Sequence, residues 1–470
     1  MTHAPAILPP IRQLSPFQVP LFWMFLGPPA LRIAVVDDRS GLSSLSGDQD
    51  IWNYIRLAWW IFWGLVAMVS LLRHGGITRQ LTARLGTLPY WAAAFIGGLG
   101  VGSFASEYPL FSLANVAMMV MLIVAATDLA VKIFAGVIST ARCLRTILWF
   151  AVALLVFVGI LYLLYPQLRY EGWFGYRLRG ESFAYVPLLS VILILVGLHF
   201  VLATDGSRKL VYIAVVAFGF YWLLLSQTRS AYLCLAVALT LLAWHHLALG
   251  RNRVALAAVV IAGLTGVVVV MMLYGNSDRV TWYVDSTYNR FVVRDYWALQ
   301  DEAVRERSLA TLNGRTEAAA VLIEGVLDQP WGFGYIGGVR SYMARPDIIE
   351  RLPDEAFIGA HNGFLEVLGG GGFLALIGYL GIFGWVLFHS RRFGNVESRV
   401  IQALLLVLVV ESIFESEIAY PFHQSPVLLW FVGAITMAAV ARESARQAAI
   451  GQPVRAPRPR PAIRAVGQLP

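Results

Sequence analysis

The chain has 470 residues, of which 58% are hydrophobic and only 14% are charged, and its mean hydropathy is +0.67. A soluble domain carries about 25% charged residues, so this composition excludes an ordinary soluble protein and indicates a polytopic membrane protein. The net charge of +8 does not indicate nucleic-acid binding, because Lys and Arg gather in the cytoplasmic loops of membrane proteins.

Twelve apolar stretches are candidates for transmembrane helices, since a bilayer core requires about 20 helical residues. The first is interrupted by Pro28, Pro29 and Arg32, and the two that flank Arg229 are short. The sequence therefore predicts an all-α integral membrane protein with about twelve spans. We place them at 17–36, 51–72, 88–104, 110–131, 146–165, 183–203, 210–225, 231–247, 254–274, 362–388, 400–413 and 427–441.

The loops between these stretches alternate in charge. Arginine and lysine occupy every second loop, whereas acidic residues such as Asp37, Asp38 and Glu107 occupy the opposite set. The positive-inside rule makes the basic set cytoplasmic and places both termini in the cytoplasm. We expect a membrane domain over 1–445, with a large periplasmic loop over 275–360, and a disordered basic tail over 446–470.

The large outer loop is expected to be structured, because loops of this length inside compact proteins are usually functional. Residues 315–328 have a helical pattern, with apolar positions at Ala318, Val321, Leu322 and Leu327, and residues 329–335 follow as a turn. Asp128 and Lys132, by contrast, lie one helical turn apart and are expected to pair near the cytoplasmic end of their span.

Arg229 stands out because almost no polar loop surrounds it. Placing a guanidinium near hydrocarbon costs at least about 2.5–3.5 kcal/mol on insertion scales, so an anionic partner is expected. The partner is either a ligand phosphate or a protein carboxylate. Glu411 and Glu415, one turn apart near the outer end of a span, could neutralise Arg229 or could do acid–base chemistry, and we favour neutralisation.

Each of the other arginines on the outer side has two possible roles. Arg177 and Arg179 are interleaved with Tyr and Trp, so they could line a sugar-binding groove or anchor the chain at the membrane interface. Arg315 opens the predicted loop helix, where it could bind an anion or simply be solvated.

His361 is the histidine of the outer loop, at the start of the span over 362–388. An imidazole with a pKa of about 6.5 can take up and return a proton near neutral pH, and a helix N-terminus offers free N–H groups to an anion. The alternative is an interfacial histidine with no chemical role. Asn362 has the character of a helix cap, and the glycine run 369–372 indicates close helix packing or a kink.

Three motifs, in this order and around one long outer loop, resemble the O-antigen ligase/polymerase superfamily over about residues 183–441. They are Arg229-Ser-Ala, Asn-Gly-Arg315-Thr-Glu followed by Asp328-Gln-Pro-Trp-Gly-Phe-Gly, and His361-Asn-Gly-Phe-Leu-Glu. The resemblance implies a GT-C-like, all-helical glycosyltransferase of the bacterial inner membrane. Its donor would be a glycan on undecaprenyl pyrophosphate. Its acceptor would be lipid A-core for a ligase, a lipid-linked glycan for a polymerase, or a protein hydroxyl.

The resemblance also implies roles for individual residues. His361 would be the base that activates the acceptor, and Arg229 and Arg315 would bind the pyrophosphate, with Arg179 as a further candidate. Relatives often carry an arginine before a glycine near Arg179, but the fit leaves Arg177 and Arg179 undecided. Inversion at the anomeric carbon is expected, with no metal and no cofactor. Glu411, Glu415 and Asn362 would support the site.

Two other classes of function remain as alternatives. A lipid or polysaccharide transporter or flippase would also have many spans and outward-facing arginines, but it predicts ionisable residues at mid-membrane and inverted repeats. A non-catalytic scaffold of an envelope polysaccharide complex is the second alternative.

Overall fold

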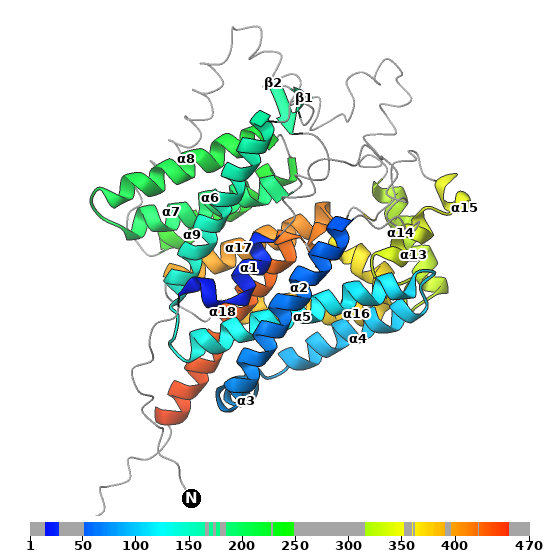
Figure 1. Cartoon of the computed structure of the whole chain (residues 1–470), viewed down its shortest axis with the longest axis horizontal. Coiled ribbons are helices and arrows are strands. Elements are labelled where there is room, and N and C mark those ends of the chain that lie inside the picture. The colour runs from blue at the N-terminus through cyan, green and yellow to red at the C-terminus, as the bar shows by residue number, and fades with distance from the viewer. Residues whose placement is uncertain are drawn as a thin grey trace, which may run out of the picture.

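The computed structural model describes residues 15–27, 51–164, 169–172, 175–178, 185–226, 229–248, 315–351, 360, 362–390, 396–421 and 423–450. The predicted span over 254–274 and both Arg179 and His361 lie outside these residues. Of the tail predicted over 446–470, residues 446–450 continue helix α18, and the rest lies outside the described residues. Figure 1 shows the described part as a bundle, with α6–α9 grouped on one side and the short helices α13–α15 on the opposite side.

Ten of the twelve predicted stretches coincide with a helix. The helical fold class is confirmed, because hydropathy alone is enough to locate long apolar helices. These helices are α2 (Ile51–Arg73), α4 (Leu88–Phe104), α5 (Pro109–Phe134), α6 (Thr140–Leu164), α7 (Tyr185–Ala203), α8 (Arg208–Ser226), α9 (Arg229–Ala248), α16 (Gly363–Ser390), α17 (Val396–Phe414) and α18 (Gln424–Ile450).

Six helices of the described part are long and apolar enough to cross a membrane. A seventh candidate is a bent pair in which α2 and α3 (Gly75–Thr82) meet at 92°. The protein is therefore a multi-pass membrane protein, and the figure of about twelve spans stays a prediction. A two-stranded antiparallel hairpin, β1 (Arg169–Gly172) and β2 (Gly175–Leu178), adds to the helical fold.

The first predicted span differs from the structure. Helix α1 (Pro20–Leu26) has seven residues, so it is about 10 Å long and cannot cross a bilayer. It follows a short 3₁₀ turn, η1 (Pro16–Gln18), and ends at Gly27, whose φ is 33°. Helix α1 is buried and contacts α2, α5, α6 and α18. The Pro28-Pro29 pair that follows cannot continue a helix, which explains the early end.

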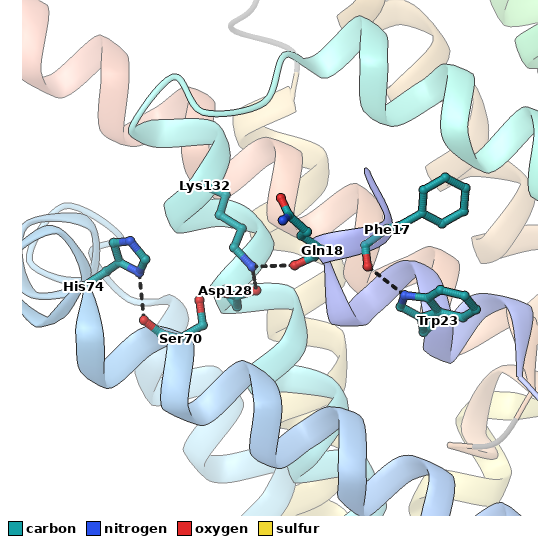
Figure 2. A network of polar contacts seen from close by, with 7 residues as sticks. All are labelled: Phe17, Gln18, Trp23, Ser70, His74, Asp128 and Lys132. Atoms are coloured by element: carbon teal, nitrogen blue, oxygen red, sulfur yellow. Dashed lines mark hydrogen bonds and ion pairs between the residues drawn. The ribbon is translucent and has the colours of Figure 1, made fainter. Parts of the chain in front are cut away.

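The pair Asp128–Lys132 is confirmed, and it reaches the N-terminal segment. Lys132 Nζ lies 2.6 Å from Asp128 Oδ2 and donates to the carbonyl oxygen of Gln18 at 3.1 Å. Figure 2 draws both contacts as dashed lines. Both charged side chains are almost fully buried. The ion pair on α5 therefore helps to hold η1 and α1 inside the bundle.

Helices α4 and α16 form the most extensive helix–helix contact in the described part. Their backbones approach so closely that a Cβ on Gly98 would meet the backbone of Ala375, and one on Gly102 would meet the carbonyl group of Gly370. Gly378 faces the backbone of Phe95 in the same way. Small residues permit this approach, as they do in many membrane helix pairs.

The short helices α13 (Arg315–Asp328), α14 (Gly337–Met343) and α15 (Pro346–Ile349) form a second, smaller core against α16. Helix α13 has the predicted bounds, and Ala318, Val321 and Leu322 are buried as expected. Leu327 is 63% exposed, however, while the neighbouring Val326 is fully buried. Positions 318, 322 and 326 lie on one face of α13 at 100° per residue, whereas Leu327 lies on another face and is exposed.

Candidate functional site

Helix α16 is broken at the glycine run that the sequence marked as a packing site or kink. Gly371 (φ −142°, ψ 16°) and Gly372 (φ 66°, ψ −163°) are not helical. In an unbroken helix the N–H of Phe373 would donate to the carbonyl oxygen of Gly369. Here Phe333 N donates to Gly369 O at 2.7 Å, and Phe373 N donates to Pro330 O at 3.3 Å. The turn after α13 thus gives a new hydrogen-bond partner to each of the two backbone groups, Gly369 O and Phe373 N, that the break separates.

The residues of this turn leave little space for side chains. Gly332 has φ +82° and its backbone lies against residues 369–372, so a Cβ there would meet the Gly369 carbonyl oxygen at 2.6 Å. A Cβ on Gly372 would meet the carbonyl group of Pro330. The turn after α13 and α16 therefore contact each other through backbone atoms, and this contact requires glycine at positions 332 and 372.

Tyr335 ends the turn and is fully buried. Its hydroxyl donates to the carbonyl oxygen of Ala419, and burial raises its pKa well above the ordinary value, so it stays a donor at neutral pH. The next residue, Ile336, has φ 60° and ψ −66°, and Gly337 N donates back to Tyr335 O at 2.7 Å. This is a γ-turn with positive φ, which is a strained conformation for a β-branched residue.

A buried polar cluster lies beside Tyr335. The Arg340 guanidinium of α14 stands 5.3 Å from the ring centroid of Tyr420, a cation–π contact. Burial, aided by the Glu366 carboxylate, raises the pKa of Tyr420 to about 12. Glu366, in the first turns of α16, is fully buried, and its Oε2 accepts a hydrogen bond from Ala360 N at 3.4 Å. Residues of α14, α16 and the segment before α18 thus meet next to position 360.

Asn362 caps α16, as its sequence position predicts. Its Oδ1 accepts hydrogen bonds from Phe364 N at 2.9 Å and Leu365 N at 3.0 Å. Its Nδ2 donates to the carbonyl oxygen of Ile413 at 2.9 Å. The start of α16 is therefore attached to the last turn of α17.

The start of α9 reaches the same turn. Ser230 Oγ donates to Glu415 Oε1 at 3.1 Å, just beyond the end of α17. Ser230 and Asn362 are the residues that follow Arg229 and His361 in the sequence. Two positions 132 residues apart in the chain are thus joined to residues 413–415.

Glu411 connects the neighbouring helices in another way. It is 7% exposed, and its Oε1 accepts a hydrogen bond from Ser425 Oγ of α18 at 2.9 Å. Its Oε2 has no hydrogen-bond partner among the described residues. Glu411 and Glu415 therefore each bind a serine hydroxyl, from α18 and α9 respectively.

The structure describes the side chains of some predicted site residues but not of others. Those of Glu411, Glu415 and Asn362 are described, and they hydrogen-bond to Ser425, Ser230 and Ile413, respectively. Arg229 and Arg315 are the first residues of α9 and α13, and only their backbones are described, while Arg179 and His361 lie outside the described residues. Whether Glu411 or Glu415 neutralises Arg229 therefore stays a prediction.

The sequence reasoning missed a second set of residues, Glu366, Arg340, Tyr335 and Tyr420. Glu366 carried a usable signal, because an ionisable residue inside an apolar helix is a functional candidate by default. The other three carried none, since their proximity depends on how the outer loop docks on the bundle.

The O-antigen ligase family model matches residues 213–388, which are less than half of the chain. A search of the curated proteins found no match. The matched region runs from α8 to α16 and includes the break in α16 and the turn that fills it. It also carries Arg229, Arg315 and His361. The resemblance of this membrane protein to the O-antigen ligase/polymerase superfamily is therefore confirmed over residues 213–388.

Proposed function

We propose that the protein is an inner-membrane glycosyltransferase that moves a glycan from undecaprenyl pyrophosphate to an acceptor hydroxyl, as an O-antigen ligase does. The observation that carries the proposal is the meeting of Ser230 and Asn362 at residues 413–415. It supports a single site for Arg229 and His361, since each precedes one of these two anchored residues. The family match supports lipid-linked glycans as the substrate class.

In the proposed reaction the acceptor oxygen attacks C1 of the donor sugar from the side opposite the pyrophosphate. The C1–O bond to the pyrophosphate breaks, and the leaving group departs as lipid pyrophosphate with the bonding electron pair. His361 takes the proton of the acceptor hydroxyl, a step that contributes typically about 10²–10⁴ in rate. The product is a glycoside with inverted configuration.

The arginines have an electrostatic role in this proposal. Arg229 and Arg315 would hold the pyrophosphate and stabilise the negative charge that grows on it, and Arg179 is a further candidate. The pyrophosphate is a good leaving group, so the reaction is proposed to need neither a metal nor a cofactor. Glu415 would keep the first turn of α9 in place through Ser230.

The test uses purified protein and a polyprenyl-pyrophosphate-linked oligosaccharide, with transfer measured on a gel of the product. His361→Ala should reduce transfer about 100-fold or more because the acceptor loses its base. Arg229→Ala should reduce it by weakening the hold on the pyrophosphate. Arg351→Ala is the control, because that arginine forms an exposed ion pair with Glu324. Transfer by His361→Ala at the wild-type rate would refute the proposed mechanism.

The same assay separates the ligase from the polymerase of this superfamily. Lipid A-core and additional lipid-linked donor are supplied in separate reactions. Consumption of lipid A-core supports the proposed ligase activity. Growth of the donor into longer lipid-linked chains would instead assign polymerase activity, and movement of donor across vesicles without any transfer would assign a flippase.

A further inference from the structure

A cavity of about 350 Å³ lies where α5 ends, where α6 and α17 begin, and beside the last turns of α18. Ligand pockets in proteins usually measure about 300–1,000 Å³, so this cavity has room for a small ligand. Lys132 and Arg142, on either side of the α5–α6 turn, belong to a basic loop predicted to be cytoplasmic. The cavity therefore lies at the predicted cytoplasmic end of the bundle, and none of its lining residues belongs to the site described above.

The lining changes from apolar to charged along α18. Ile133 of α5, Ile401 of α17 and Ile435 of α18 line the cavity and are buried. Further along α18, the lining residues at positions 442, 443 and 446 are charged and exposed. The helix rises about 16 Å between positions 435 and 446. An acyl chain joined to a charged headgroup has the same sequence of polarity.

Four charged side chains line the cavity, two of each sign: Arg442, Arg446, Glu397 and Glu443. Arg442 Nη2 donates to the carbonyl oxygen of Ile133, which fixes the guanidinium beside the cavity. The half-buried Glu397 carboxylate interacts electrostatically with Arg442 without forming an ion pair. Within the part of the chain that the structure describes, no ion pair involves any of these four groups. Two guanidinium groups and two carboxylates are therefore available to a ligand.

We propose that this cavity binds a phospholipid whose headgroup carries both a phosphate and a primary ammonium group, as an ethanolamine phospholipid does. Arg442 and Arg446 bind the phosphate, and Glu397 and Glu443 accept hydrogen bonds from the ammonium group. An acyl chain lies against the buried isoleucines. This inference does not depend on the proposed glycan transfer.

The balance of charges favours this headgroup over the other common ones. An anionic headgroup without an ammonium group would place its phosphate beside two carboxylates that stay unpaired. A choline headgroup has the positive charge but no N–H group to donate to the carboxylates. Either lipid would leave part of the charged lining without a partner, which disfavours its binding.

The first test uses the purified full-length wild-type protein and requires no variant. Delipidated protein receives equal amounts of ethanolamine, choline and glycerol phospholipids with identical oleoyl chains, and native mass spectrometry counts the lipids retained. The ethanolamine lipid should be retained about tenfold more than either of the others, since one charge-assisted hydrogen bond contributes roughly this factor. Equal retention of the three lipids, or a preference for the choline or glycerol lipid, would overturn the proposal.

Free phosphoethanolamine separates a lipid site from a site for a soluble phosphate ester. It carries the same charges without an acyl chain, so it loses the contribution of burying apolar surface. At a concentration equal to that of the lipid, it should leave the ethanolamine phospholipid bound. Displacement of the lipid under these conditions would contradict the assignment to a phospholipid.

Variants show whether the lipid binds in this cavity. Glu397→Gln combined with Glu443→Gln removes both carboxylates and keeps both arginines, so the preference should change from the ethanolamine to the anionic glycerol lipid. Arg446→Gln, at an exposed position, should weaken the retention of the ethanolamine lipid about tenfold. Glu324→Gln, at an exposed ion pair on α13, is the matched control and should keep the wild-type preference.

The wild-type preference in both the double variant and Arg446→Gln would mean that the lipid binds elsewhere, which refutes the proposed site. Melting temperatures show whether each variant is folded. If the double variant does not fold, Arg446→Gln decides, since its side chain forms no hydrogen bond or ion pair with another described residue. Unchanged retention by Arg446→Gln would then refute the proposed site.

Discussion

Tyr335 joins three parts of the chain that are far apart in sequence. Its backbone N–H donates to Ser103 Oγ of α4 at 3.5 Å, and its hydroxyl donates to the carbonyl oxygen of Ala419 just before α18. The strained γ-turn at Ile336 follows at once. Backbone strain of this kind costs on the order of 1–3 kcal/mol and persists only where the surroundings hold it. Here the buried Tyr335 and the close contact of Gly338 with the Phe333 carbonyl group hold it.

Tyr335→Phe should therefore lower the stability of the protein by about 1–3 kcal/mol. The ring still fills its place, but the Ala419 carbonyl oxygen loses its donor in a buried setting. The measurement is thermal unfolding in detergent. Tyr342→Phe is the control, because its hydroxyl makes a long contact of 3.4 Å to Val321 O and the side chain is only half-buried. Equal melting temperatures for Tyr335→Phe and wild type would show that the hydrogen bond contributes nothing.

At the scale of elements, the break in α16 is the point where the outer-loop helices attach to the bundle. Residues 330–333 bind the two backbone groups that the break leaves without their helical partners, Gly369 O and Phe373 N. This segment lies within the residues that the O-antigen ligase family model matches. The attachment places α13, whose first residue is Arg315, beside the start of α16. The break therefore contributes to the contact between α13 and α16.

Gly372→Ala should detach this segment. At φ +66° and ψ −163° a side chain costs on the order of 1–3 kcal/mol, and the new Cβ would also overlap the Pro330 carbonyl group, which adds typically about 1–3 kcal/mol. Gly384→Ala on the same helix is the matched control, since no atom lies within 4 Å of its Cβ. Proteolysis of the outer loop should become faster in Gly372→Ala, and glycan transfer should fall. Unchanged proteolysis in both variants would contradict the role of the break.

The parts of this arrangement differ in how far sequence could predict them. Helix positions, the cap at Asn362, the helix at 315–328 and the glycine break each follow from local patterns of hydropathy, capping and glycine content. The pairing of residues 330–333 with 369–373 does not, because its two hydrogen bonds join positions 36 and 43 residues apart through backbone groups. The burial of α1 and the meeting of Ser230 with Glu415 depend on tertiary packing in the same way.

For the whole molecule, polar contacts inside the bundle are found near opposite ends of α5 and its neighbours. The buried pair Asp128–Lys132 lies at the end that the charge pattern predicts to be cytoplasmic. There Lys132 donates to the carbonyl oxygen of Gln18. The cluster around Glu366 and Tyr420 lies with the outer-loop helices.

The predicted orientation can be tested with single cysteines and a maleimide that does not cross membranes. Leu327 on α13 is 63% exposed and belongs to the loop predicted to be periplasmic. Ser207, in the turn between α7 and α8, is exposed and belongs to a basic loop predicted to be cytoplasmic. Leu327→Cys should be labelled in spheroplasts, whereas Ser207→Cys should be labelled only after the membrane is permeabilised. The wild-type chain is the unlabelled control, because Cys143 and Cys234 are both buried. The opposite pattern would mean that the protein has the reverse orientation in the membrane, with the proposed site on the cytoplasmic side. Labelling of both positions from one side would contradict the alternation of loops from which the orientation was predicted.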